Sequence, residues 1–158
     1  MVTRRTFVTR VAGVVAVGAS GGLLWARLAR PGVDPTAITI YKSSTCECCA
    51  KWVEHVRANG FAPSIHDEQD LDAVKDRLGV PKAVRSCHTG QVEGYLIEGH
   101  VPAADIRRLL TERPKVAGLA VPGMPTRTPG MAEPGDKIEG FEVVAFQNDG
   151  GTKTFARY

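Results

Sequence analysis

The sequence predicts one α/β domain between residues 37 and 113, with a targeting segment before it and a loop-rich tail after it. Within those bounds, short apolar stretches of strand character alternate with segments whose apolar residues recur at helical spacing. The chain has 158 residues and is 43% hydrophobic, which is enough to bury the core of one domain. Many of its 17 Gly and 10 Pro fall in the last third and predict loop there. There are no internal repeats.

The predicted elements follow the order β-α-β-α-β-β-α. Strands are predicted where β-branched and aromatic residues cluster, and helices where an apolar stripe ends at a glycine. The elements are strand AITIYKS (37–43), helix AKWVEHVRANG (50–60), strand FAPSIHDE (61–68), helix DLDAVKDRLG (70–79), a strand pair in CHTGQVEGYLIEG (87–99) and helix VPAADIRRLLTE (101–112). This is the order of a thioredoxin- or glutaredoxin-like domain.

The tail departs from that order and is expected to pack on the same domain. Residues 115–140 have no helical or strand period, so they predict a Pro/Gly loop, which also holds Met124 and Met131. Residues 141–158 predict a strand, a turn at 148–151 and a last strand, which together form a C-terminal β-hairpin.

Residues 1–30 predict a signal for export. Arg4 and Arg5 precede Phe7 and an uncharged apolar run over 11–26, which resembles a bacterial twin-arginine signal. The run has 16 residues, short of the about 20 that a membrane span needs, so an uncleaved membrane anchor is the alternative. Residues 31–36 are expected to be a linker. Either way, the domain is expected in the periplasm.

The charge of the chain argues against nucleic-acid binding. The net charge of +3 depends on five arginines in residues 1–30, where there is no acid. The remaining residues hold 15 basic and 17 acidic side chains, a balance of −2. A nucleic-acid interface needs a basic face, and nothing in this composition predicts one.

The cysteines are the strongest chemical signal in the chain. Three of the four lie within STCECCAKW (44–52): Cys46 and Cys49 form a C-x-x-C pair, and Cys48 makes it C-x-C-C. Cys48 or Cys49 is expected in the first helical turn, where free N–H groups and the helix dipole stabilise thiolate. Cys46 and Cys49 can bridge easily, whereas the adjacent Cys48 and Cys49 rarely would. A framework of purely structural disulfides therefore fits poorly.

The number of thiols favours a metal site over a redox pair. A redox pair needs two thiols, and a third invites scrambling, whereas extra sulfurs can bridge metal ions. Thiolates select Cu(I) or zinc. Zinc is the less favoured of the two, because structural zinc sites usually combine two separated C-x-x-C pairs. Tight C-x-C and C-C spacing is typical of multinuclear Cu(I)–thiolate sites.

Cys87 can join the other three only in one register of the predicted fold. If Pro81 began the third strand, Cys87 would lie about 20 Å along it and out of range. If residues 80–86 form a turn and the strand begins at Cys87, then Cys87 and His88 lie beside the C-x-C-C segment. We prefer this second register.

Methionine and histidine offer further ligands. Met124 and Met131 each follow a glycine in the Pro-stiffened loop, and thioethers bind Cu(I) in oxidising compartments. His88 is the best histidine candidate because it adjoins Cys87, and His100 is a weaker one. His55, on an exposed helix face, and His66, at a strand end, are expected to be solvated.

Four motifs in order resemble one family. YKSSTCECCAKW, SCHTG, EGHVPAADI and GLAVPGMP…PGM are together similar to the exported, CopG-like copper-resistance proteins, over about residues 37–132 and most of the tail. The resemblance implies a thioredoxin-like fold with a cysteine-bound copper cluster and a role in copper handling outside the cytoplasm. Carried over by position, the ligands it implies are Cys46, Cys48, Cys49 and Cys87, with Met124 and Met131.

Three functions therefore compete. The first is an exported copper-binding protein with Cu(I) held by four thiolates, acting alone or with other periplasmic copper-handling proteins. The second is a thiol–disulfide or copper-redox enzyme in which Cys46 attacks and Cys49 resolves. The third thiol and the lack of a Trp before Cys46 argue against that enzyme. The third is a secreted interaction module with structural cysteines.

Overall fold

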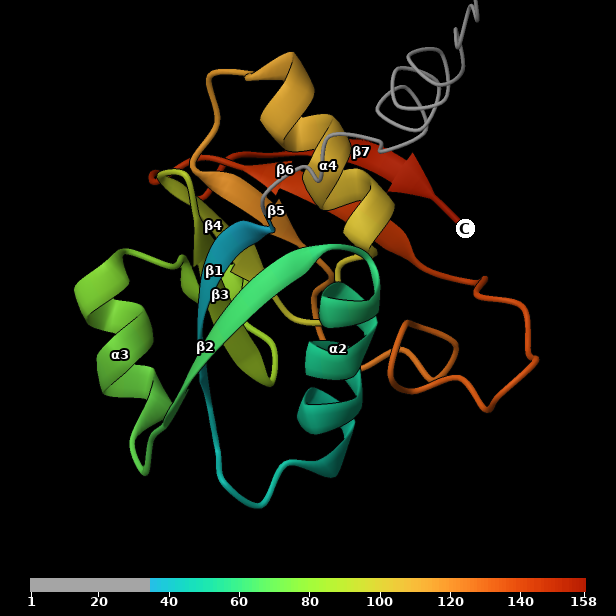
Figure 1. Cartoon of the computed structure of the whole chain (residues 1–158). Coiled ribbons are helices and arrows are strands. Elements are labelled where there is room, and N and C mark those ends of the chain that lie inside the picture. Colours follow the sequence, from blue (N-terminus) through green and yellow to red (C-terminus); the bar gives the residue numbers. More distant parts are fainter. Residues whose placement is uncertain (1–34) are drawn as a thin grey trace, which may run out of the picture. The chain divides into compact units, whose positions relative to one another are not determined.

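The computed structural model describes residues 35–158, which form a seven-stranded sheet and three helices (Figure 1). The predicted signal lies outside the described residues. The elements are β1 (Thr36–Lys42), α2 (Glu47–Ala58), β2 (Phe61–Asp67), α3 (Leu71–Leu78), a 3-10 turn (Lys82–Val84), β3 (His88–Val92), β4 (Tyr95–Glu98), α4 (Ala103–Glu112), β5 (Gly118–Ala120), β6 (Glu142–Phe146) and β7 (Thr152–Arg157). The predicted α/β class and the predicted order of the first seven elements are confirmed.

The strands pair in the order β2-β1-β3-β4-β5-β6-β7. β1 runs parallel to β2 and antiparallel to β3, and β3 and β4 form an antiparallel hairpin. In this arrangement the end of β1 and the start of β3 lie side by side, with Lys42 opposite His88. The loop after β1 leads into the C-x-C-C segment at the start of α2, so the pairing brings this segment next to Cys87.

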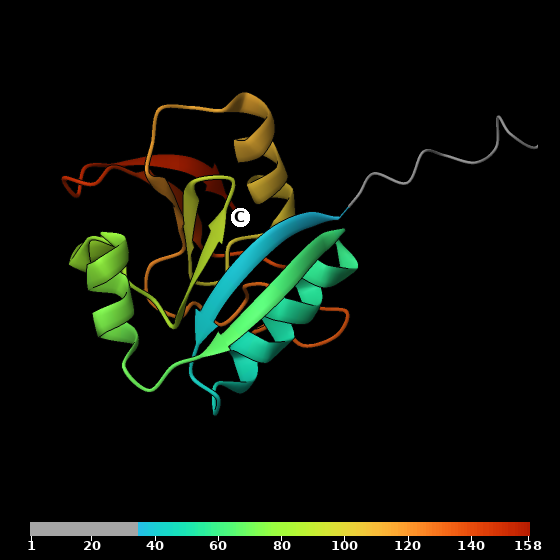
Figure 2. The same ribbon diagram turned by 60° about the vertical axis from the view of Figure 1, so that its left-hand side comes forward.

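The helices cover the two faces of the sheet unequally. The apolar sides of α2 and α4 share the larger core cluster, which includes the fully buried Trp52, Ile106 and Leu109. α3 lies on the other side of β1 from α2 (Figure 2). Of the α3 residues, Val74 and Lys75 are buried, while Leu71 and Leu78 are only partly covered. The buried face of α3 therefore does not coincide with its apolar stripe. It is displaced around the helix by about one residue and includes Lys75.

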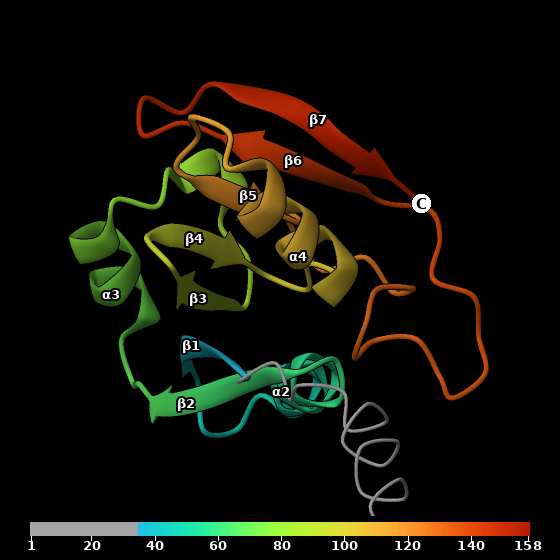
Figure 3. The ribbon, with the colours of Figure 1, turned by 45° about the horizontal axis from the view of Figure 1, so that its top comes forward.

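The prediction of loop throughout residues 115–140 is wrong for Gly118–Ala120, which form β5. β5 pairs parallel with β4 and antiparallel with β6, and through it the C-terminal hairpin extends the same sheet (Figure 3). A three-residue strand is too short to show a period in sequence, and pairing on both sides defines it. Gly118 is required there, because a Cβ would lie 1.9 Å from the Leu96 carbonyl oxygen. The predicted hairpin, β6 and β7, is confirmed.

None of the helices in residues 35–158 has the length and apolar character that a membrane crossing requires.

Candidate metal centre

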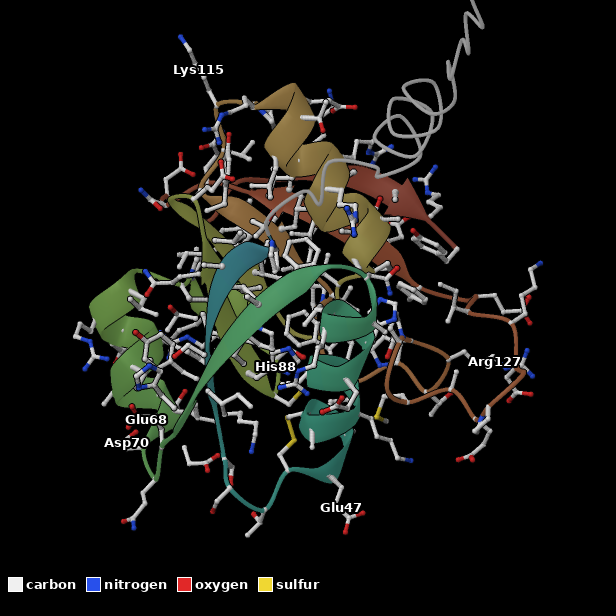
Figure 4. The ribbon with its side chains drawn as sticks, viewed as in Figure 1. Glu47, Glu68, Asp70, His88, Lys115 and Arg127 are labelled. Carbon is white, nitrogen blue, oxygen red and sulfur yellow. A yellow bond between two sulfur atoms is a disulfide. The ribbon has the colours of Figure 1, made fainter. Side chains whose placement is uncertain are left out.

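The C-x-C-C segment begins α2. Cys46 is the N-cap, with an extended backbone at φ −80°, and its Sγ accepts a hydrogen bond from the Cys49 N–H at 3.4 Å. Cys48 and Cys49 lie in the first turn, as predicted. The three cysteines therefore lie at the positive end of the α2 dipole, where one free N–H of the first turn already binds a sulfur. Figure 4 shows Glu47 at this end of α2 and His88 beside the helix.

Cys46 and Cys49 form a disulfide, with their Cα atoms 5.3 Å apart. Cys48 and Cys87 stay outside the bond. This is the pairing that the sequence marked as geometrically easy. With this disulfide formed, the Cys48 sulfur still lies 3.6 Å from that of Cys46. The disulfide therefore changes the chemistry of two of the sulfurs but keeps the sulfurs close together.

All four sulfurs lie within 4.8 Å of one another, and Cys87 directly precedes β3. Residues 82–84 form a 3-10 turn and β3 begins at His88, so the second register described above is correct. Cys49 is fully buried, whereas Cys46, Cys48 and Cys87 are partly exposed. The cluster is therefore anchored at its base and open to solvent on one side.

Two imidazoles flank the Cys87 sulfur. His88 Nδ1 lies 3.4 Å from it and His100 Nε2 lies 3.1 Å from it. Burial raises the pKa of the Cys87 thiol to about 11, and the nearby Cys48 acts in the same direction. Without a metal, Cys87 is thus a protonated thiol at neutral pH. A cation that binds there must displace this proton.

His100 is better placed to bind a metal than the sequence indicated. Its Nδ1 lies 2.7 Å from the Pro129 carbonyl oxygen, so Nδ1–H donates there and Nε2 presents a lone pair toward Cys87. Both imidazoles are buried, and burial lowers the pKa of each below its ordinary value, which keeps them neutral. The His88 ring packs against Trp52 in a tilted arrangement, and its Nε2 is buried without a hydrogen-bond partner among the described residues.

Buried histidines next to thiols are ordinary metal ligands, and neutrality suits that role. His100 was underrated because 12 residues separate it from Cys87, and only the β3–β4 hairpin brings the two together. The sequence signal was the EGH triplet of the third motif.

The expectation that His55 is solvated is wrong. His55 is half-buried, and its Nε2 accepts a hydrogen bond from the Ala103 N–H at 3.1 Å, at the start of α4. The N-cap of α4 is Pro102, which supplies no side-chain acceptor. His55 thus caps another helix. His66 is exposed, as expected, and stacks on Tyr41.

We expect this cap to make stability depend on pH. Burial lowers the pKa of His55 below its ordinary 6.5, and His100 adds to the effect. The unfolded chain therefore binds a proton that the folded chain excludes, and stability is lost as the pH falls below 6.5. His88 and His100 act in the same direction. His55→Gln keeps an acceptor that does not titrate, so it should flatten the fall in melting temperature between pH 7 and 5. An unchanged slope would contradict the cap.

Residues 121–131, which hold Met124 and Met131, form the methionine loop. Two hydrogen bonds hold this loop beside the cluster. The Ser86 hydroxyl donates to the Gly123 carbonyl, and His100 donates to that of Pro129. Met124 follows the first of these contacts and is 62% exposed, while Met131 lies just past the second and is partly buried. The loop therefore lies against the segment that carries Cys87. No described hydrogen bond joins either thioether to a cysteine.

Two solved structures, of the copper resistance protein CopG in Form 1 and Form 2, match this fold. Each is 47% identical to this chain at a TM-score of 0.72, with 78% of this chain and 98% of the solved chain covered. The chain belongs to the CopG family. The family model described as "protein of unknown function, DUF411" matches residues 84–131. A comparison with curated protein sequences found no match.

The match to DUF411 covers only part of the cluster in this chain. It includes Cys87, both imidazoles and the methionine loop, and it begins after the C-x-C-C segment. The CopG structures cover nearly their whole length in the alignment, so their similarity extends over both halves of the site. In this CopG-family chain the cluster thus combines the start of α2 with the residue directly before β3.

Proposed function

We propose that this protein binds Cu(I) through the thiolates of Cys46, Cys48, Cys49 and Cys87 and serves copper resistance outside the cytoplasm. The observation that carries the proposal is the approach of all four sulfurs to within 4.8 Å of one another. Its family context supports copper, because the similar solved structures are of a copper resistance protein. The twin-arginine pattern in residues 1–30 supports the periplasm.

The donor set fits copper better than zinc. Thiolates and thioethers are soft donors that favour Cu(I), and thiolates crowded this closely can each bridge two metal ions. We therefore expect a multinuclear site. Reduction of the Cys46–Cys49 disulfide would supply two of the four thiolates. A zinc site is the second choice, as four thiolates also suit it.

The two histidines and two methionines would bind copper at different sides of the site. His88 and His100 would complete the buried side of the site, where their neutral nitrogens lie beside Cys87. Met124 would act at the exposed edge, accepting Cu(I) from solution or from another copper-handling protein. Met131 would close the site from the loop. Copper bound at Cys87 releases a proton, so binding should strengthen as the pH rises.

Anaerobic titration of Cu(I) into the reduced protein, against a chromophoric chelator, tests the function. We expect more than one tightly held copper per chain. The same titration at two pH values one unit apart should show tighter binding at the higher pH. A protein that never competes with the chelator would refute Cu(I) binding, and preferential retention of zinc would favour the zinc site.

The Cys46–Cys49 disulfide favours a second function, in copper redox chemistry. Oxidation of the two thiols to the disulfide releases two electrons and two protons, and two Cu(II) ions would accept one electron each to become Cu(I). Cys48, Cys87 and the imidazoles would remain as donors. This function predicts Cu(II) reduction that requires both Cys46 and Cys49, whereas storage or transfer of Cu(I) does not.

A further inference from the structure

A lysine and a glutamate form an ion pair inside the protein, next to the proposed centre. Lys75 on α3 is 3% exposed, and Glu98 at the end of β4 is fully buried. The Lys75 ammonium donates to a Glu98 carboxylate oxygen and, at 2.8 Å, to the hydroxyl of Thr89. Removing two charges from water costs several kcal/mol per ion, and a well-packed apolar pair is often equally stable. A gain in folding stability is therefore a weak explanation for the presence of this ion pair.

The carboxylate of Glu98 binds the chain on both sides of Cys87 and His88. The Ser86 N–H donates to one carboxylate oxygen at 2.6 Å, and the Thr89 hydroxyl donates to the other at 2.6 Å. Ser86 and Thr89 bracket the two residues that face the cluster. One rigid group therefore fixes the start and the end of this two-residue segment.

The backbone strengthens the same connection. Thr89 lies opposite Glu98 in the β3–β4 ladder, and the Gly99 N–H donates to the His88 carbonyl at 3.0 Å. Lys75 adds the third element, because it ties α3 to this ladder. The ion pair gives the buried carboxylate a counter-charge, and its two oxygens accept hydrogen bonds from Lys75, Ser86 and Thr89.

We propose that the Lys75–Glu98 pair positions the metal centre: it holds Cys87 and His88 in place through Ser86 and Thr89. The inference rests on the proposed function. Lys75 and Glu98 touch no metal in this proposal. They act through the neighbouring chain, as groups outside a metal's ligand shell commonly do.

The test compares Glu98→Gln with the double variant Lys75→Met/Glu98→Gln. The single variant leaves Lys75 buried without its anion, so it can unfold the protein. The double variant removes both charges and keeps the side-chain volumes similar. Val143→Ala, at a fully buried position in β6, is the control for a general loss of stability. Each protein is reduced and titrated with Cu(I), and its Cu(I)–thiolate absorption is recorded.

We expect the folded double variant to bind Cu(I) at least about tenfold more weakly, with an altered absorption band. The reason is that mutation of residues that support metal ligands typically lowers metal affinity about 10–100-fold. Val143→Ala should bind as the unchanged protein does, even where its melting temperature is equally reduced. A double variant that binds within twofold, with the same absorption band, would overturn the proposal.

A second measurement separates this proposal from the proposed function. In the reduced, metal-free protein, the alkylation rate of Cys87 reports how firmly its segment is held. We expect Cys87 to react several-fold faster in the double variant, with Cys48 unchanged as the internal reference. If the unchanged protein binds no copper, the proposed function fails, and alkylation still decides the positioning. Equal Cys87 rates would refute the positioning alone.

Discussion

Replacing Cys49 with serine is expected to abolish most tight copper binding. Cys49 is the fully buried thiol, and its sulfur lies within 4.8 Å of the other three sulfurs and of donor atoms on His88 and His100. Serine has nearly the same shape and offers a hard oxygen that Cu(I) disfavours. Mutation of a residue that only supports a metal ligand typically lowers metal affinity about 10–100-fold. Loss of the ligand Cys49 itself should therefore lower Cu(I) affinity by about 100-fold or more.

Competitive Cu(I) titration of reduced Cys49→Ser measures the effect. Ser44→Ala is the matched control, because Ser44 is an exposed residue of the same loop and should bind copper normally. The melting temperature of metal-free, reduced Cys49→Ser should change little, which separates loss of a ligand from loss of fold. A variant with undiminished copper capacity would rule out the four-thiolate centre.

Replacing Gly130 with alanine is expected to detach the methionine loop from α2. Gly130 has a φ of +86°, and a Cβ there would lie 2.7 Å from the Trp52 nitrogen and 2.9 Å from the Cys48 carbonyl oxygen. Both contacts are with backbone of α2, which cannot move aside cheaply. Left-handed strain and overpacking each cost about 1–3 kcal/mol, so the variant should lose about 2–6 kcal/mol of stability.

Gly123→Ala is the control, since it shares the loop and the left-handed backbone, with φ +72°, but a Cβ there meets nothing within 4 Å. It should cost only about 1 kcal/mol. Chemical denaturation of both variants gives the difference, which measures the close approach. We also expect Gly130→Ala to speed proteolysis within 121–131 and to weaken copper binding, because His100 loses its partner at Pro129. Equal stabilities for the two variants would contradict a tight contact.

Local sequence predicted the fold well where elements are long. The apolar stripe of α2, the glycine after α3 and the turn between β6 and β7 each depend on neighbours a few residues away. β5 was missed because three residues carry no period. The inward face of α3 was predicted incompletely, since the burial of Lys75 depends on Glu98, which is 23 residues away.

The sequence by itself determined the chemistry: crowded thiols, soft donors and a cysteine pair at a helix start follow from residue type and spacing. Only the tertiary structure decided which distant groups join them. Pairing of β1 with β3 brings Cys87 to the other three sulfurs, and the β3–β4 hairpin adds His100 and Glu98. The physical reason is that strand pairing joins residues across long loops. Their approach depends on register, which the ladder as a whole sets and no single segment encodes.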